Sequence, residues 1–479
     1  MKKFVLVRVP TLESAYNSFA DFSAIFLPVG LITIAAVLEQ SKYEVKIIDG
    51  DAERLTFEET LARVVKEAPD YIGSTVMTAT IDITGQFYSR LKAVLPEVIT
   101  IVGGPHVSSL PEKSLKEFAD IDIVVVGEGE ETVAELMPVL AAKEDLGKVR
   151  GIVFRKNGQI IKNENRPPIS DLGTTLMPAF HLLNFHLYRS YGWNGWVGGH
   201  RSPIGVIFTS RGCVGRCNFC ASHCVFGQGM RFFSSERIKA EIDLLVNQYN
   251  IRILYFQDDT FTVNRKLVNE ICDHLIERGY NRRLEIMVST RVDFVHEPTF
   301  RKMRKAGVRW VCFGVESGNQ NILDKMNKGT TLQQIRSAFK KVNDLGFYVV
   351  GNYMIGGLGE TWETAMDTIN LACELKHDYA AFSIAIPFPG SDLYRYCLKY
   401  SIKCPPWRDF GSVNSPPIAL NKSLGADKLM KLRSIAVNRF FKRPFYIVSL
   451  LRKFNARAVI KDFLQMYFAI KRESKSGRF

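Results

Sequence analysis

The chain has 479 residues, of which 46% are hydrophobic and 23% are charged, which excludes a disordered tail protein, a collagen and a heptad rod. The net charge is +14, but 14 Lys and Arg residues in the segment 428–479 face only Asp462 and Glu473, so this segment contributes +12. Such uneven charge excludes a nucleic-acid surface that covers the whole protein. Nine cysteines in so long a chain do not indicate the disulfide framework of a small secreted domain.

Residues 1–145 are expected to form a doubly wound, Rossmann-like α/β domain. Short β-branched runs alternate with segments of helical spacing, which is typical of a parallel sheet with helices on both faces. The predicted strands are Phe4–Val9, Glu44–Ile48, Tyr71–Val76, Ile99–Val102 and Ile123–Val126. Loops at the carboxyl ends of such strands usually bind the ligand. These loops contain Asp49-Gly50-Asp51, Thr78-Ala79-Thr80, Gly103-Gly104-Pro105-His106 and Gly127-Glu128-Gly129-Glu130.

No targeting or membrane-spanning segment is predicted near the start of the chain. Met1-Lys2-Lys3 leads directly into the first strand pattern, unlike a secretory signal. The uncharged run from Ala24 to Leu38 has 15 residues and contains Pro28 and Gly30, so it is too short for an ordinary spanning helix. We therefore expect a cytoplasmic protein.

Three further regions follow. Residues 146–200 are expected to be a connector, with a hairpin at Asn157-Gly158. Residues 201–395 alternate strand and helix patterns again, which predicts a partial (β/α)6 barrel with its chemistry at the strand carboxyl ends. Its predicted strands are Ile204–Thr209, Ile253–Phe256, Leu284–Val288, Trp310–Val315, Tyr348–Met354 and Ala380–Ile386. Residues 396–479 are expected to form a basic helical region.

The strongest chemical signal is a group of three cysteines, Cys213, Cys217 and Cys220, directly after the first strand of the predicted barrel. Thiolates hold iron–sulfur clusters, which usually take four of them, so three would leave one iron open to a substrate or cofactor. A zinc site is the alternative, because His223 and Cys224 follow closely. The remaining cysteines do not have the close spacing of a second cluster.

The pattern Cys-x3-Cys-x-aromatic-Cys, in which Phe219 is the aromatic residue, resembles the radical S-adenosylmethionine (radical SAM) superfamily. The later strand ends agree with this resemblance in order. They are Gln257-Asp258-Asp259, Ser289-Thr290-Arg291, Gly314-Val315-Glu316, Gly356-Gly357-Leu358-Gly359-Glu360 and Pro387-Phe388-Pro389-Gly390. The resemblance implies that the three cysteines hold a 4Fe-4S cluster. Its open iron would chelate S-adenosylmethionine, whose cleavage yields a 5′-deoxyadenosyl radical.

The resemblance also implies roles for residues at these strand ends. Asp258 or Asp259 would accept hydrogen bonds from the methionyl amine, Arg291 would pair with the carboxylate, and Glu316 would bind ribose hydroxyls. The expected cofactor-binding set is completed by Phe219, Ser289, Gly356, Gly357 and Glu360. As an alternative, the two aspartates could cap the next helix, and Arg291 could form a surface ion pair with Asp293. The sequence Gly-Gly-Leu-Gly-Glu-Thr departs from the family's frequent Gly-Leu-Pro-Gly-Glu-Thr.

The amino-terminal loops resemble the cobalamin-binding domain that is fused to many radical SAM enzymes. This class includes the anaerobic magnesium-protoporphyrin monomethyl ester cyclase and hopanoid methylases. The residues that the resemblance implies for cobalamin are Asp49, Thr78, Gly103, Gly104, Gly127, Glu128 and Gly129. The motif Asp-x-His-x-x-Gly, which supplies a cobalt ligand elsewhere, is absent, and we do not assign His106 that role. A domain that kept the fold and binds no cobalamin is the alternative.

The basic tail mixes cations with aromatic residues. Phe463, Met466, Tyr467 and Ile470 recur at helical spacing, as in helices that lie on anionic membrane surfaces. A helical lid packed on the barrel is the alternative, and no nucleic-acid partner is expected. The aromatic stretch that includes Trp193 could line a substrate entrance or pack between domains.

These patterns predict a cytoplasmic, cobalamin-dependent radical SAM enzyme, peripheral at the inner membrane face. The expected reaction is methyl transfer to an unactivated carbon of a lipid, isoprenoid, tetrapyrrole or other membrane-associated small molecule. An electron donor such as flavodoxin or ferredoxin would be its protein partner. A radical SAM oxidative cyclase is the first alternative, and a non-catalytic cobalamin or iron–sulfur sensor is the second.

Overall fold

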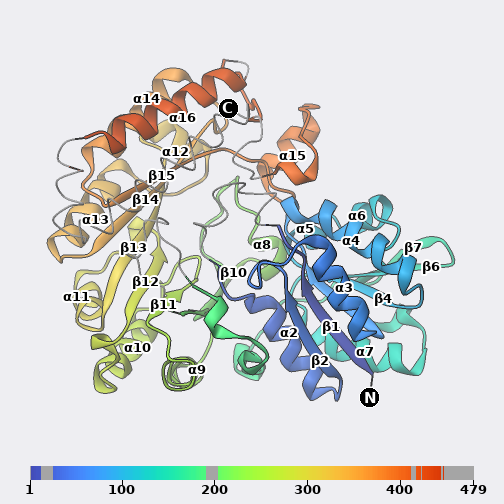
Figure 1. The fold of residues 1–479 in the computed structure, drawn as a ribbon. Coiled ribbons are helices and arrows are strands. Elements are labelled where there is room, and N and C mark those ends of the chain that lie inside the picture. Colours follow the sequence, from blue (N-terminus) through green and yellow to red (C-terminus); the bar gives the residue numbers. More distant parts are fainter. Residues whose placement is uncertain are drawn as a thin grey trace.

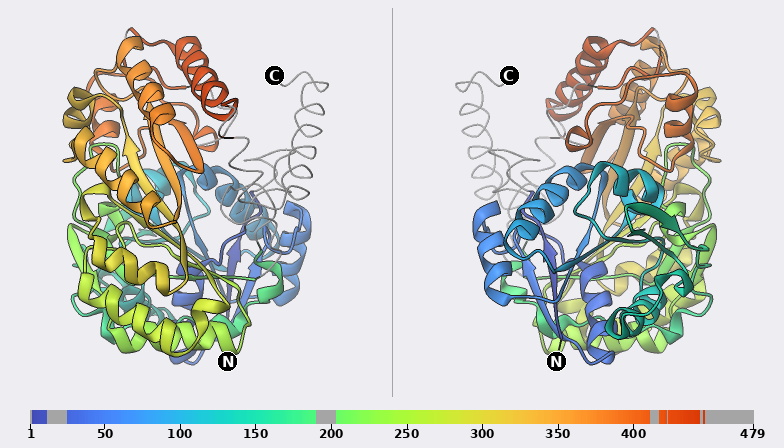
Figure 2. Two further views of the ribbon diagram at one scale, coloured as in Figure 1. Left: turned by 90° about the vertical axis from the view of Figure 1, so that its left-hand side faces the viewer. Right: turned by 90° about the vertical axis from the view of Figure 1, so that its right-hand side faces the viewer.

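The computed structural model describes residues 2–11, 25–189, 203–410, 417–421, 423–443 and 446. Two α/β units, each built on its own main sheet, lie side by side; Figures 1 and 2 show the first in blue and the second from green to orange. The aromatic stretch around Trp193 and most of the basic tail lie outside the described residues.

The first unit is a sheet whose parallel strands follow the order β2-β1-β3-β4-β5, as in a doubly wound fold. Its strands are β1 (Lys3–Arg8), β2 (Glu44–Asp49), β3 (Tyr71–Thr75), β4 (Ile99–Gly103), β5 (Ile123–Val125), β6 (Ile152–Lys156) and β7 (Gln159–Lys162). The five predicted strands of this unit are thereby confirmed. The predicted hairpin, β6 and β7, pairs antiparallel with β5 and so extends this sheet.

Side chains that alternate along the strands divide the core of this unit between the two faces of the sheet. Phe4 and Leu6 of β1 face one apolar cluster, and Val5 and Val7 face the other. The first face is covered by α2 (Val29–Gln40) and α7 (Glu130–Ala142). The second is covered by α3 (Phe57–Glu67), α4 (Ile81–Val94), α5 (Pro105–Ser109) and α6 (Pro111–Glu117).

Helix α2 contains most of the uncharged run Ala24–Leu38 and is a helix that the sequence pattern does not predict. It is buried from two sides, because Leu31 packs on the first sheet while Ile32 packs into the core of the second unit. A helix with two buried sides has no polar face, and therefore no clear helical period in its sequence. Among the described residues, no helix is long and apolar enough to span a membrane.

The second unit is an all-parallel sheet of six strands in the order β8-β11-β12-β13-β14-β15, which confirms the predicted partial barrel. These strands are β8 (Ile204–Ile207), β11 (Ile253–Phe256), β12 (Glu285–Thr290), β13 (Val308–Glu316), β14 (Tyr348–Ile355) and β15 (Tyr379–Ile384). A separate antiparallel hairpin, β9 (Ser210–Cys213) and β10 (Gly229–Phe232), lies between the two units with α8 (His223–Phe226) (Figure 1).

Most helices of the second unit start at a residue whose side chain accepts a hydrogen bond from the first turn. Thr331 and Gln334 form a reciprocal capping box at the start of α13, and Ser234, Asn264 and Thr361 cap α9, α10 and α14. The helices are α9 (Ser235–Asn247), α10 (Arg265–Glu277), α11 (Glu297–Lys305), α12 (Gln320–Lys325), α13 (Leu332–Asp344), α14 (Trp362–Glu374), α15 (Asp392–Lys399) and α16 (Ala426–Phe441).

Within the described part of the basic carboxyl-terminal region, helix α16 packs on α14 and β15. Leu429, Leu432, Ala436 and Phe440 are buried at helical spacing and join the core of the barrel. Tyr446 Oη donates to the Asp378 carbonyl oxygen at 3.0 Å. This helix is therefore part of the barrel, while the residues beyond 446 lie outside the described part of the chain.

Candidate active site

The three cysteines of the motif lie at the end of β9 and on the loop that connects β9 to α8 and β10. All three are partly buried, and Cys213 ends β9. A Cβ atom added to Gly215 would lie 3.5 Å from Cys213 Sγ and 3.6 Å from Cys217 Sγ, so both sulfurs face this residue. Glycine therefore keeps the backbone close to the two thiols. The same Cβ would lie 3.0 Å from Arg291 Nη1, which puts a cation next to them.

In the described residues, no three Cys, His, Asp or Glu side chains converge on one point where they could share a metal ion. A cluster does not require this, because each cysteine binds a different iron. Burial raises the pKa of the Cys217 thiol, against the charges of Lys328 and Arg291, which lower it. The loop thus places its thiols beside two buried cations.

The two predicted aspartates differ in their surroundings. Asp258 is buried, accepts hydrogen bonds from the backbone N and Oγ1 of Thr209 at 3.0 and 2.9 Å, and is bonded to Ser210 Oγ. Burial raises its pKa to about 6. Asp258 thus holds the turn between β8 and β9. Asp259 is exposed and accepts a hydrogen bond from Ser222, whose Oγ lies 3.4 Å from Cys220 Sγ.

Arg291 and Glu316 lie at the carboxyl ends of β12 and β13, close to the cysteine loop. Arg291 pairs with Asp293, with Nη2 2.9 Å from Oδ2, and also donates to the Lys328 carbonyl oxygen at 2.8 Å. The predicted alternative pair therefore exists, although Arg291 is buried and not on the surface. Glu316 pairs with the buried Lys328 at 2.9 Å and has a φ of 67°, a strained conformation for a non-glycine residue.

The glycine-rich turn after β14 is held by its own glutamate. Glu360 is buried, and one of its carboxylate oxygens accepts the backbone N–H of Gly356. Its other oxygen, Oε1, is buried without a partner among the described residues. Burial raises the pKa of Glu360 to about 7. Gly356 has a φ of 91°, so the turn needs glycine there.

Two further residues that were predicted to bind S-adenosylmethionine are Phe219 and Ser289. Phe219 packs in a small apolar cluster with Met326 and Cys397. Ser289 is on β12, with Oγ 3.1 Å from Tyr255 Oη.

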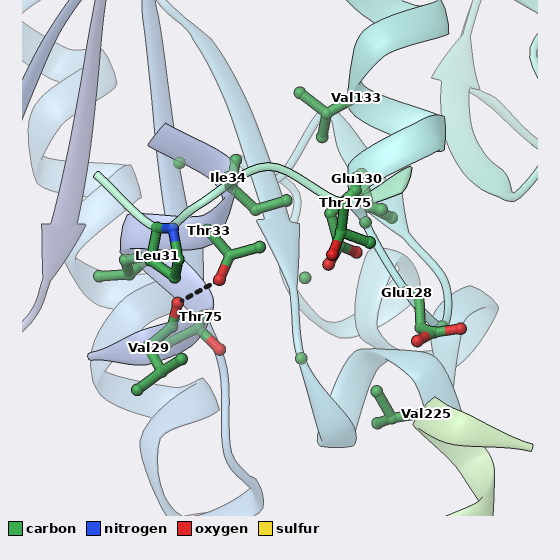
Figure 3. Close-up of a pocket in the computed structure, with 18 of the residues that line it drawn as sticks. Val29, Leu31, Thr33, Ile34, Thr75, Glu128, Glu130, Val133, Thr175 and Val225 are labelled. Carbon is green, nitrogen blue, oxygen red and sulfur yellow. Dashed lines mark hydrogen bonds between the residues drawn. The ribbon is translucent and has the colours of Figure 1, made fainter. Parts of the chain in front are cut away.

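The predicted cobalamin loops line a cavity of about 300 Å³ between the two units (Figure 3). Predicted residues in its lining are Gly103, Gly104, Gly127, Glu128 and Gly129. Helix α2 contributes Val29, Leu31, Thr33 and Ile34, and α7 contributes Val133 and Met137. Gly104 has a φ of 105°, and a Cβ there would lie 2.8 Å from Val76 N. The lining is largely apolar.

Asp49 and Thr78 do not line this cavity. Asp49 is buried and accepts hydrogen bonds from Tyr188 Oη at 2.9 Å and from Ala52 N at 3.0 Å. Thr78 Oγ1 lies 3.3 Å from Nδ1 of His106, a buried histidine whose pKa burial lowers to about 4. The predicted cobalamin residues are therefore divided into a group at the cavity and two outside it.

Buried ion pairs connect the cavity loop to the cysteine hairpin. Glu128 binds Arg211 Nη1 through Oε1 and Arg231 Nη1 through Oε2, both at 2.7 Å, and Glu130 also pairs with Arg211. Arg211 precedes Cys213 on β9 and lines the same cavity. The loop of the first unit is thus fixed to the strand that carries the first cysteine.

Comparison with known proteins decides the family. A model of the radical SAM superfamily matches residues 207–372, and a model of the B12 binding domain matches residues 19–137. An uncharacterized methyltransferase of Pyrococcus horikoshii is 32% identical over 97% of this chain and 98% of its own length. The chain belongs to the cobalamin-binding radical SAM enzymes. This family membership confirms the predicted 4Fe-4S cluster, S-adenosylmethionine and cobalamin as its cofactors.

Two further similarities agree with this family. The anaerobic magnesium-protoporphyrin IX monomethyl ester cyclase of Rubrivivax gelatinosus is 28% identical over 81% of this chain and 70% of its own length. The structure of the cobalamin-dependent radical enzyme OxsB with aqua-cobalamin and S-adenosylmethionine bound has a TM-score of 0.74. That match covers 98% of this chain and 71% of OxsB at 17% identity, and therefore supports the fold.

Sequence reasoning missed Lys328, Arg211 and Arg231. Lys328 lies in an irregular segment after α12 and belongs to no recognisable motif, and a lysine is rarely buried unless it is paired. Arg211 and Arg231 lie on β9 and β10, and neither belongs to a sequence motif that would indicate a buried ion pair. A signal for Arg211 existed in its position just before Cys213, but nothing in the sequence pairs it with Glu128.

Proposed function

We propose that this radical SAM enzyme transfers a methyl group to an unactivated carbon of a lipid, isoprenoid, tetrapyrrole or similar membrane-associated molecule. The observation that carries the proposal is that both cofactor regions contribute to one cavity wall, which we call the shared wall. Arg211, on the strand that ends at Cys213, lines the same cavity as Gly127 and Glu128. The two cofactor regions therefore adjoin. When bound, the cluster with S-adenosylmethionine supplies a radical oxidant, and cobalamin supplies the methyl group.

In this proposal, Cys213, Cys217 and Cys220 hold the cluster, and the cations beside them favour the thiolate form. Arg291 places positive charge next to Cys213 and Cys217. Asp258 fixes the turn between β8 and β9, which precedes the cysteine loop, by accepting hydrogen bonds from Thr209. The proposed binding surface for S-adenosylmethionine consists of Phe219, Asp259, Ser289, Glu316, Gly356, Gly357 and Glu360.

The residues that line the cavity between the two units would bind an apolar part of cobalamin. Gly103, Gly104, Gly127 and Gly129 allow the backbone to come close to the cofactor. Glu128 keeps its loop fixed through Arg211 and Arg231. Asp49 and Thr78 do not line the cavity. Their proposed role is to support the loops at the carboxyl ends of the strands of the first sheet.

Two observations favour a membrane-associated substrate. The segment 447–479 carries eight Lys and Arg residues with several aromatic residues and only two acids, a composition suited to an anionic membrane surface. The Rubrivivax relative is named for a magnesium-protoporphyrin ester. That relative is a cyclase, so oxidative ring closure is the second candidate reaction.

The mass of the product distinguishes the two reactions. The protein is reconstituted anaerobically with iron, sulfide and hydroxocobalamin, and incubated with methyl-labelled S-adenosylmethionine, a reductant and either a magnesium-protoporphyrin ester or a polyprenyl lipid. We expect about four irons and about one cobalt per chain, and a product in which one labelled methyl group has replaced a hydrogen atom. A product that has lost hydrogen without label would replace methyl transfer by cyclisation. Four irons without cobalt would contradict the proposal.

Truncation after Tyr446 tests the membrane part of the proposal. This variant keeps α16, which packs on the barrel, and removes the eight basic residues beyond it. Each basic residue near an anionic surface contributes about 1 kcal/mol, so we expect sedimentation with phosphatidylserine vesicles to fall at least about tenfold. Phosphatidylcholine vesicles are the neutral control. Unchanged binding to the anionic vesicles would contradict a role for the tail.

A further inference from the structure

A pair of cysteines lies apart from the cluster motif, at the end of α15. The side chains of Cys397 and Cys404 belong to one packed cluster, and each thiol shifts the pKa of the other. The backbone brings them together: Ser401 has a φ of 52°, and Ile402 N donates to the Cys397 carbonyl oxygen at 2.9 Å. This reversal at the helix end returns the chain towards α15.

The two thiols differ in access and in acidity. Cys397 is completely buried, and its hydrogen bond to Cys404, together with burial, raises its pKa far above the usual range. Cys404 is partly exposed, and the hydrogen bond from Cys397 together with the charge of Lys113 lowers its pKa to about 7. An accessible thiolate is the nucleophile in thiol–disulfide exchange, and a neighbouring thiol can resolve the mixed disulfide.

Two other cysteines outside the cluster motif lack both the access and the acidity of Cys404. Cys272 and Cys312 are buried, and burial raises the pKa of each to about 12. Such thiols stay protonated and are inert in exchange. Cys373 is partly exposed like Cys404 and serves as a matched comparison.

We propose that Cys397 and Cys404 form a reversible disulfide by exchange with a low-molecular-weight disulfide such as oxidised glutathione. The Cys404 thiolate attacks one sulfur of the oxidant, forms a mixed disulfide and releases one thiolate. Cys397 then loses its proton and attacks the Cys404 sulfur, which releases the second thiolate. The two protein thiols lose two electrons and two protons, and the oxidant is reduced to two thiols.

The bond would act on a strap that joins the two units. This strap, residues 404–410, rests on the first unit: Trp407 Nε1 donates to Glu117 Oε2 at 2.7 Å, and Arg408 N donates to Asp82 Oδ2 at 2.9 Å. The Trp407 ring also lies edge-on to His106, with centroids 4.9 Å apart. A disulfide would therefore fasten the strap to α15, next to the loop that carries Gly103 and Gly104.

The test uses the full chain with its cluster intact, kept anaerobic and treated with oxidised glutathione. Remaining thiols are alkylated, and the protein is cleaved with trypsin. We expect the peptides Tyr396–Lys399 and Cys404–Arg408 to be recovered as one disulfide-linked species that dithiothreitol separates. Cys404 should also be alkylated faster than Cys373 before oxidation.

Single variants assign the two roles. Cys404→Ser should abolish the linked species, and Cys373→Ser should leave its yield unchanged. Cys397→Ala should leave Cys404 trapped as its glutathione mixed disulfide, because the resolving thiol is gone. Two results would overturn the proposal: a free, alkylatable Cys404 after treatment of the wild type, or a wild type that retains as much mixed disulfide as Cys397→Ala.

Discussion

Replacing Cys217 by alanine is expected to remove the iron–sulfur cluster and to lower 5′-deoxyadenosine formation by more than about 100-fold. Loss of a group that only orients a metal ligand already costs about 10–100-fold, and loss of a ligand itself should cost more. Cys217 and Cys213 face the same glycine beside Arg291, so both thiols belong to one site. Iron and sulfide content and anaerobic cleavage of S-adenosylmethionine with dithionite measure both effects.

Cys373→Ala is the matched control, because Cys373 is partly exposed but lies on α14, away from the loop. Iron content and cleavage should stay at the wild-type level in this variant. Circular dichroism should show the same helix content in both proteins. Retention of the cluster in Cys217→Ala, with its loss in Cys224→Ala, would show that a different set of thiols holds the metal.

The second large effect is expected at the connection between the units. Arg211→Met should lower the free energy of unfolding by about 3–5 kcal/mol, the usual cost when one partner of a buried ion pair is removed. Arg211 pairs with Glu128 and Glu130, and all three side chains are nearly buried. The variant leaves the two carboxylates in the interface without this cation. Urea unfolding, followed by tryptophan fluorescence and circular dichroism, measures the change.

Arg150→Met provides the comparison, since Arg150 pairs with Glu164 at 2.9 Å on the surface, where the two side chains are 45% and 75% exposed. The free energy of unfolding of Arg150→Met should therefore be lower than that of the wild type by less than about 1 kcal/mol. Adding Glu130→Gln to Arg211→Met should recover part of the stability, because Glu130 loses its arginine in that variant while Glu128 keeps Arg231. Equal, small losses in Arg211→Met and Arg150→Met would contradict a stabilising role for the buried pairs.

Much of the fold could be predicted because strand patterns are local. Phe4–Val9 and Tyr71–Val76 are recognisable from their own apolar residues, and their alternation with helices implies a parallel sheet. Helix α2 could not be predicted, since burial by both units removes the polar face that produces a helical period. The hairpin at Asn157-Gly158 was recognisable from its turn, but its pairing with β5 depends on a contact with a distant strand.

The chemistry of the cysteine loop can be read from the amino-acid sequence. Cys213, Cys217 and Cys220 lie so close along the chain that their spacing limits what they can bind. The neighbours of that loop depend on the folded structure. Arg291 reaches it from the end of β12 and Lys328 from the segment after α12, and Arg211 meets Glu128 across the two units. A local motif constrains its own backbone, whereas a pair far apart in the chain forms only where the packing of whole sheets and helices brings its members together.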